Sequence, residues 1–326
     1  MQSIAIFNNK GGVGKTTYIY HVAHLLAEKG KKVLLVDCDS QSNLTAYCLD
    51  DKKISDAWSE KGNSIYRGIE LVYRGIGDIR SEVEPIKVGN SLYLVPGDIR
   101  LSNFEDALGD TWNSAKGGSE PSIRAQSAIY RFSKLMAEKI NADVIMYDLG
   151  PNLGALNRAV LGASDYFITP VAPDLFSIQG TENLGSKFES WRQGWAQCNS
   201  SWKGDEIEIP KGMPIFLGYV VQRHNIRDNK EGMTQGWQIY ADQIDGAIVK
   251  NIIKKLEESG QVYTWPDGFN LGKIPNLHSL IPYSLAARKP VFNCTRRDGL
   301  NGAHISRARE SKNHFTPIVN RLLKVI

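Results

Sequence analysis

The chain has 326 residues and a formal net charge of only +4, with 42% hydrophobic and 23% charged residues. This composition is ordinary for a soluble globular protein, and the length allows one large α/β domain or two small ones. No apolar run is long enough to cross a bilayer and no signal peptide is visible, so we expect a cytoplasmic protein. The four cysteines form no Cys-x-x-Cys pair and no common zinc spacing, which favours reduced thiols.

The first element predicted along the chain is a short buried strand, residues 3–8, followed by a glycine-rich loop. Residues 10–17 of this loop read Lys-Gly-Gly-Val-Gly-Lys-Thr-Thr. They fit the phosphate-binding pattern G-x-x-x-x-G-K-[ST], except that Asn9 occupies the usual first-glycine position. Apolar residues at helical spacing then continue to Gly30. Strand, glycine loop and helix together place a helix N-terminus against phosphate.

The residue types in this loop predict a site for a nucleoside polyphosphate with Mg²⁺. Glycines let successive backbone N–H groups converge on a phosphate. Lys15 supplies positive charge for the β- and γ-phosphate oxygens, and the Thr16 hydroxyl suits Mg²⁺. The candidate cofactor-binding residues of the loop are Gly11, Gly12, Val13, Gly14, Lys15, Thr16 and Thr17. Lys10 has no role in that scheme, so its charge must serve another purpose.

Helical patterns alternate with apolar strand runs through the rest of the chain. The further predicted strands are residues 33–36, 91–95, 143–147, 165–171, 215–221 and 272–274. We also predict a helix over 123–140 and another beginning at Glu189. This alternation predicts an α/β fold with a doubly wound, mostly parallel sheet and helices on both faces. We expect a single domain over 1–326, with elaborations at about 50–90 and 190–212 and a basic C-terminal segment, 286–326.

Two of the predicted strands end in aspartates suited to a Mg·ATP site. Asp37 and Asp39 follow the strand at 33–36, and Asp148 follows the strand at 143–147. Ligands bind at the carboxyl ends of parallel strands. Hydrolysis of a magnesium nucleotide needs one carboxylate that holds the metal and another group that orients the attacking water. Asp148 suits the first role and Asp39 the second.

These segments resemble the deviant Walker ATPases of the ParA/MinD family, and they favour its ParA branch. The loop is joined by Val-Asp-Cys-Asp-Ser-Gln-Ser-Asn at 36–43 and Tyr-Asp-Leu-Gly-Pro-Asn-Leu-Gly at 147–154. Residues 170–180, 274–275 and 286–291 also fit, so the similarity covers nearly the whole chain. The resemblance implies a slow, partner-stimulated hydrolase of ATP to ADP and phosphate. It also implies a homodimer that sandwiches ATP, non-specific DNA binding on the nucleoid in the ATP state, and plasmid or chromosome partition with a ParB-like activator.

The resemblance assigns roles to individual side chains at the phosphate end of the site. Lys10 would reach across the dimer to the phosphates bound by the other subunit. It would form the catalytic set with Lys15 and with Asp39, which positions the attacking water. Thr16 would ligate Mg²⁺, which Asp37 and Asp148 would organise through its water shell.

At the other end of the nucleotide, Gln222 would contact adenine and Pro275 would line the base. These two positions follow the predicted strands at 215–221 and 272–274.

The C-terminal segment 286–326 is markedly basic, with nine Lys and Arg residues against two Asp and Glu, an excess of seven. Such a segment is a candidate polyanion surface, and the alternative is an ordinary solvated face. Non-specific DNA binding requires phosphate neutralisation rather than base reading, so Arg and Lys on one face suffice. By resemblance, a basic residue at position 227 contacts nucleic acid in some relatives. The candidate DNA contacts are Arg227, Arg296, Arg297, Arg307 and Arg309.

Two further patterns favour structural roles. His21 and His24 have no partner at metal-ligand spacing, so we place both on the surface of the first helix. An apolar stripe from Phe315 to Leu323 fits a membrane-binding helix of the MinD type or a last helix packed on the core, and we expect the latter.

Other functions stay open at this point. One alternative is a membrane-based positioning ATPase of the MinD type, which co-sedimentation with liposomes in the presence of ATP, without DNA retention, would favour. Relatives of the nitrogenase iron protein need cysteines after the strand at 143–147, and residues 149–174 contain none. An ATPase of the ParA/MinD type that positions another cargo, such as a membrane-associated complex or a defence-system component, has the same motifs, because the partner determines the cargo.

Overall fold

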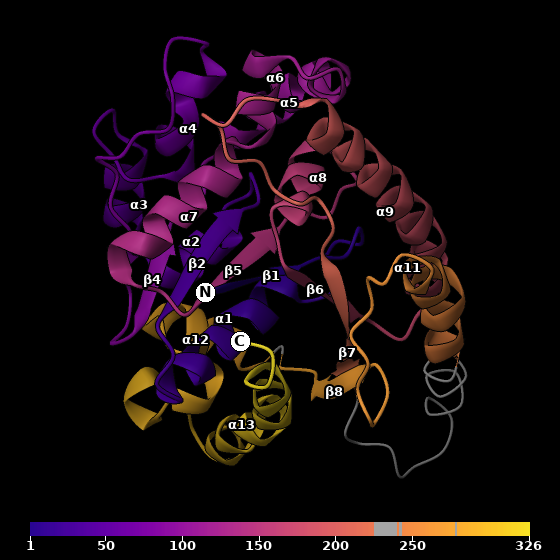
Figure 1. Ribbon diagram of the computed structural model, residues 1–326. Coiled ribbons are helices and arrows are strands. Elements are labelled where there is room, and N and C mark those ends of the chain that lie inside the picture. The colour runs from indigo at the N-terminus through magenta and orange to yellow at the C-terminus, as the bar shows by residue number, and fades with distance from the viewer. Residues whose placement is uncertain (225–239, 241–242, 278) are drawn as a thin grey trace.

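The computed structural model describes residues 1–224, 240, 243–277 and 279–326 (Figure 1). The strands in these ranges form one eight-stranded sheet in the order β3-β4-β2-β5-β1-β6-β7-β8. All neighbouring strands pair in parallel except β3 and β4 at one edge. The strands are β1 (Gln2–Ile6), β2 (Val33–Cys38), β3 (Ile86–Lys87), β4 (Leu92–Val95), β5 (Val144–Leu149), β6 (Tyr166–Val171), β7 (Ile215–His224) and β8 (Asn270–Pro275). The predicted α/β class and mostly parallel sheet are confirmed.

Helices cover both faces of this sheet (Figure 1). One face carries α1 (Lys15–Glu28), α2 (Asn43–Cys48), α3 (Asp51–Trp58), α12 (Ile281–Ala287) and α13 (Ala303–Leu322). The other carries α4 (Ile65–Tyr73), α5 (Leu101–Lys116), α6 (Glu120–Gln126), α7 (Ala128–Ile140), α8 (Ala155–Gly162), α9 (Leu175–Ser201) and α11 (Lys254–Glu257), with a π-helix at Val249–Ile253. The central strands are continuous apolar runs because both of their faces are covered.

Two predicted helices have different bounds in the structure. The helix expected over 123–140 is two helices, α6 and α7, separated at Ser127, whose hydroxyl donates to the Ile123 carbonyl (2.8 Å). The helix expected to begin at Glu189 begins at Leu175, where the Asp174 carboxylate accepts from the Ser177 N–H (2.9 Å). Such side-chain capping satisfies a backbone donor that the helix leaves unpaired.

Glycines obscured the first half of α9 in the sequence, because glycine weakens a helical pattern. Gly185 is needed for packing instead: a Cβ there would lie 1.8 Å from the Asn251 carbonyl oxygen of the π-helix. The elaboration at 50–90 contains α3, α4 and β3, and the loop after α9 closes a small separate core around Trp195.

The C-terminal helix packs on the core as expected. Four residues of its apolar stripe are at most 1% exposed and contact the layer formed by α1 and β8; they are Phe315, Ile318, Val319 and Leu322. No helix within the described ranges has the length and apolar character needed to cross a membrane.

The surface position predicted for His21 is wrong. This residue is 0% exposed and its ring stacks on Phe315, with centroids 5.0 Å apart and 11° between the ring planes. His24, one turn later, is half-buried against Tyr20. The burial arises because α13 covers the face of α1 that carries His21.

Candidate nucleotide site

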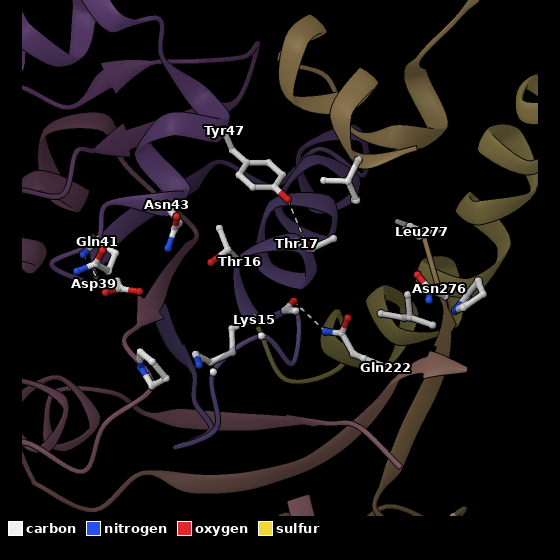
Figure 2. Close-up of a pocket in the computed structure, with 17 residues that line it drawn as sticks. Lys15, Thr16, Thr17, Asp39, Gln41, Asn43, Tyr47, Gln222, Asn276 and Leu277 are labelled. Atoms are coloured by element: carbon white, nitrogen blue, oxygen red, sulfur yellow. Dashed lines mark hydrogen bonds between the residues drawn. The ribbon is translucent and has the colours of Figure 1, made fainter. Parts of the chain in front are cut away.

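A cavity of ≈ 380 Å³ lies at the carboxyl edge of the sheet, between the loops after β1, β2 and β5, the end of β7, and β8 with the segment that follows it (Figure 2). It is lined by Gly11, Gly12, Gly14, Lys15, Thr16, Thr17, Asp39, Gln41, Asn43, Tyr47, Pro151, Gln222, Ile274, Pro275, Asn276, Leu277 and Ile281. Most of the loop residues predicted from the sequence therefore share one cavity with Asp39, Gln222 and Pro275.

The glycine loop wraps around the N-terminus of α1. Gly12 and Gly14 have φ values of 69° and 85°, in the left-handed region that glycine adopts without strain. Gly14 is the N-cap of α1 and no side chain caps the helix, which leaves its N-terminal dipole directed at the cavity. Val13 is buried and, unlike the neighbouring glycines, is not among the residues that line the cavity.

Lys15 is the first residue of α1, directly after the glycines, and is only 7% exposed. Its Nζ donates to the carbonyl oxygens of Asn8 (3.1 Å) and Lys10 (3.2 Å). Burial lowers the pKa of Lys15, and the carboxylates of Asp148 and Asp39 oppose this shift. A buried ammonium held only by carbonyls can be stabilised further by an anionic ligand.

Asp148 and Thr16 form the part of the site that fits a divalent cation. The Thr16 hydroxyl donates to Asp148 Oδ2 (2.8 Å), while Asp148 Oδ1 is buried without a hydrogen-bond partner among the described residues. Burial, reinforced by the charge of Asp37, raises the pKa of Asp148 well above its usual range. An unpartnered carboxylate oxygen beside a threonine hydroxyl is a donor set suited to Mg²⁺ and its water shell.

Asp37 is fully buried and, like Asp148, is not among the residues that line the cavity; what distinguishes Asp37 is that both of its carboxylate oxygens accept hydrogen bonds. Its Oδ2 accepts from the backbone N–H (2.8 Å) and hydroxyl (2.6 Å) of Thr45, and its Oδ1 accepts from the Asp39 N–H (3.2 Å). Burial raises its pKa to about 7. These contacts hold the loop between β2 and α2 in place.

Asp39 reaches the cavity from that loop, and its Oδ1 accepts from the Gln41 N–H (3.0 Å) (Figure 2). Ser42, with φ 52°, has a left-handed conformation that is uncommon outside glycine, and its buried hydroxyl has no partner in the described residues. Gln41 and Asn43 also line the cavity. The sequence showed them only as loop residues, although their place beside Asp39 was a signal.

The opposite end of the cavity is bounded by β7, β8 and α12. Gln222 Nε2 donates to the Gly14 carbonyl (2.9 Å), so this side chain holds the glycine loop as well as lining the cavity (Figure 2). Pro275 is joined there by Leu277 and Ile281, and Tyr47 lies across from them with its hydroxyl 3.0 Å from the Thr17 hydroxyl. Sequence reasoning missed these three apolar and aromatic residues, because they resemble ordinary core residues.

Lys10 lies at the mouth of the loop and forms an ion pair with Asp174 of the same chain. Its Nζ is also 5.7 Å from the ring centroid of Phe176, which is 70% exposed. The Lys10 side chain is thus directed at the beginning of α9.

A second concavity, of ≈ 600 Å³, lies between the end of α12 and the start of α13. We call it the basic groove; it is lined by Lys289, Cys294, Thr295, Arg296, Arg297, Ile305 and Arg309. Of the predicted DNA contacts, the structure groups Arg296, Arg297 and Arg309 here. Arg307 does not line the groove; its Nη1 lies 3.5 Å from the Ser279 hydroxyl oxygen. Arg227 is outside the described residues.

Comparison with known proteins gives consistent matches. A family model described as an AAA domain matches residues 1–199. An uncharacterized protein of Methanocaldococcus jannaschii is 33% identical, covering 80% of this chain and 90% of that one. The chromosome-partitioning ATPase Soj of Thermus thermophilus is 29% identical, and the match covers 60% of this chain. It covers 64% of the Soj chain, which is less than two thirds of the length of that relative. The crystal structure of protein DIP2308 from Corynebacterium diphtheriae matches this structure with a TM-score of 0.64 at 29% identity, and the match covers 88% of this chain and 97% of that one.

Proposed function

Because this chain belongs to the ParA/MinD family of P-loop ATPases, we propose that it is an ATP-dependent switch of the ParA type. It binds ATP with Mg²⁺, dimerises around the bound nucleotides and binds DNA non-specifically on the nucleoid in that state. A ParB-like partner stimulates hydrolysis and so releases it, in the partition of a plasmid or chromosome. The name of the Thermus thermophilus relative, a chromosome-partitioning ATPase, supports this direction.

The nucleotide part of the proposal rests on the unpartnered Asp148 oxygen beside Thr16, at the edge of a glycine-loop cavity. In the proposed complex the loop amides and Lys15 hold the phosphates, and Thr16 and Asp148 hold Mg²⁺, which neutralises phosphate charge. Asp39 orients the attacking water. Gln222 and Pro275 border the base.

The dimer part of the proposal rests on Lys10. Its ion pair with Asp174 joins two side chains that are 26% and 37% exposed, and partly exposed pairs of this kind are weak. A triphosphate bound by a second subunit offers more negative charge than one carboxylate. Exchange of Lys10 from Asp174 to that phosphate would therefore make dimerisation depend on ATP. The exposed Leu175 and Phe176 provide apolar surface beside it.

The DNA part rests on the basic groove. Arg296, Arg297 and Arg309 converge there, and guanidinium groups suit phosphate oxygens. Such contacts neutralise the backbone without reading bases, so the binding would be non-specific and strongly salt-dependent.

The molecular mass in solution tests the proposal most directly. We expect a monomer with ADP and a dimer with Mg·ATP by analytical ultracentrifugation. Asp39→Ala should form a long-lived ATP dimer with turnover reduced about 10²-fold or more, because the attacking water loses its positioning group. Lys15→Ala should bind no ATP and stay monomeric. A wild-type protein that binds Mg·ATP yet remains monomeric would contradict the switch.

A further inference from the structure

We propose that His21 is a positioning residue that couples the nucleotide site to the basic groove. The inference rests on the proposed function, since it names the route by which bound ATP would regulate the polyanion surface. His21 belongs to neither site, and the sequence pattern had suggested only a surface histidine.

The hydrogen bonds of His21 identify its tautomer. The Val291 N–H donates to Nε2 (3.0 Å), so this nitrogen carries no proton. Nδ1 lies 2.7 Å from the Thr17 carbonyl oxygen, which can only accept, so Nδ1 carries the proton and donates. Both ring nitrogens are thus used, and the neutral imidazole links the first turn of α1 to Val291.

The ring has little freedom to move within this link. It is fully buried, stacks on Phe315 of α13, and meets the ring of Phe292 edge-on at 5.7 Å between centroids. Burial lowers the pKa of His21 to about 3, so the ring stays neutral at physiological pH. A close-packed planar ring transmits a displacement rather than absorbing it.

One end of the link, Thr17, lies in the nucleotide cavity, and the other end, Val291, lies between residues that line the basic groove. Thr17 follows Thr16, lines the nucleotide cavity and has its hydroxyl 3.0 Å from that of Tyr47, which lines the same cavity (Figure 2). Val291 begins the short 3₁₀ helix Val291–Asn293, two residues after Lys289 and three before Cys294, both of which line the basic groove.

A second contact reaches the same edge of the groove. The Ser284 hydroxyl of α12 donates to the Lys289 carbonyl (2.5 Å), and Ile281 of the same helix lines the nucleotide cavity. The backbone between Lys289 and Val291 is therefore held by two elements, α1 and α12, that both border the nucleotide. A shift of either element on nucleotide binding would change the spacing of Lys289 relative to Arg296 and Arg297.

Two variants break the link from opposite ends. His21→Leu removes both hydrogen bonds and fills the buried position with an apolar side chain of similar size. Val291→Pro removes the N–H that donates to His21, and proline suits the first position of a helical turn, where no helical hydrogen bond is lost. The preceding Pro290 already has an extended backbone (ψ 147°), which a following proline requires. His21→Gln, which can still accept from Val291, tests rescue, and His24→Leu on the same helix is the matched control.

The measurement is the ratio of Kd values for a short DNA duplex without nucleotide and with Mg²⁺ and a non-hydrolysable ATP analogue. We expect that ratio to fall at least tenfold in His21→Leu and Val291→Pro, with ATP affinity and the ATP-dependent dimer retained. It should be partly restored in His21→Gln and unchanged in His24→Leu. Because coupling between sites is reciprocal, DNA should also raise ATP affinity less in the first two variants.

A wild-type ratio in a folded His21→Leu protein would overturn the coupling role alone and leave the proposed function standing. If His21→Leu does not fold, a wild-type ratio in Val291→Pro has the same meaning. If a variant loses the ATP-dependent dimer as well as the nucleotide dependence of its DNA affinity, the coupling role would also be overturned, since the defect would then lie in the nucleotide site. A wild-type protein without nucleotide-dependent DNA binding would instead contradict the proposed function itself.

Discussion

Three aspartates approach the proposed nucleotide site, and their hydrogen bonds separate their roles. Asp37 is engaged by Thr45 and the backbone of Asp39. Asp39 reaches the cavity, and Asp148 keeps one buried oxygen without a described partner. Residue type alone does not distinguish these carboxylates, since each follows an apolar strand.

This separation predicts different outcomes for two matched substitutions. Asp148→Asn should weaken Mg-dependent ATP binding at least tenfold, because an amide replaces the charged ligand. Asp37→Asn should instead reduce the free energy of unfolding by about 1–3 kcal/mol, because its hydrogen bonds at the start of α2 are disturbed. Calorimetric ATP titration with and without Mg²⁺, together with urea unfolding, measures both effects. Equal loss of Mg-dependent binding in the two variants would show that Asp37 also serves the metal.

The ion pair of Lys10 allows an equally selective change. Asp174 both pairs with Lys10 and caps α9 by accepting from Ser177. Asp174→Asn removes the charge and keeps a good capping residue. Because an exposed pair contributes about 0.2–1 kcal/mol, we expect ATP-dependent dimerisation to tighten up to about fivefold. Sedimentation equilibrium measures the change, and weaker dimerisation would indicate that Asp174 assists the dimer rather than competing with it.

At the level of elements, the packing of α13 on α1 decides the environment of His21. The apolar stripe of α13 was recognisable from sequence, but the histidine that it covers was not. The structure makes this contact a source of pH-dependent stability, since the folded state holds a neutral imidazole that the unfolded chain can protonate.

The direction of that dependence follows from the pKa values. The pKa of His21 is lowered by burial to about 3 in the folded state, against 6.5 for the free side chain. Between these values the unfolded chain binds more protons, so stability is present above pH 6.5 and is lost as the pH falls toward 3. The contribution is about 1.4 kcal/mol per pH unit, or about 2 kcal/mol between pH 6.5 and 5.

Urea unfolding of the wild type and His21→Gln over this pH range tests the prediction: the variant should lose less stability on acidification, and parallel curves of stability against pH would contradict the buried neutral histidine. His24, whose pKa is lowered to about 4, adds a loss in the same direction in both proteins.

At the scale of the whole molecule, the fold ties the backbone of residues 289–291, beside the basic groove, to α1 and α12, and both of these helices contribute residues to the lining of the nucleotide cavity. Arg296 and Arg297, which precede α13, and Arg309 of α13 line the same groove, so the fold brings two separate basic segments together on one surface. Arg307, although close to these residues in sequence, is not part of it.

A charge reversal tests that surface. Arg296→Glu combined with Arg297→Glu should weaken DNA binding in the ATP state at least tenfold and reduce the slope of log K against log salt by about 2, because about two phosphate contacts are lost. Arg307→Glu is the matched control and should have a smaller effect. Unchanged affinity and slope in the double variant would move the DNA surface elsewhere.

Local sequence was sufficient to place every strand in the described ranges except the two-residue edge strand β3, together with the glycine loop and the aspartates at the strand ends, because glycine conformation, apolar runs and strand-to-loop transitions depend on neighbouring residues. The start of α9 was hidden in part by Gly185, a glycine that the packing requires because Asn251, far along the chain, leaves no space for a Cβ there. The partner of Lys10, the burial of His21 and the contacts that divide the three aspartates were decided only by tertiary structure. Each depends on segments brought together by the sheet and its two helical layers, and no local pattern records which of them will meet.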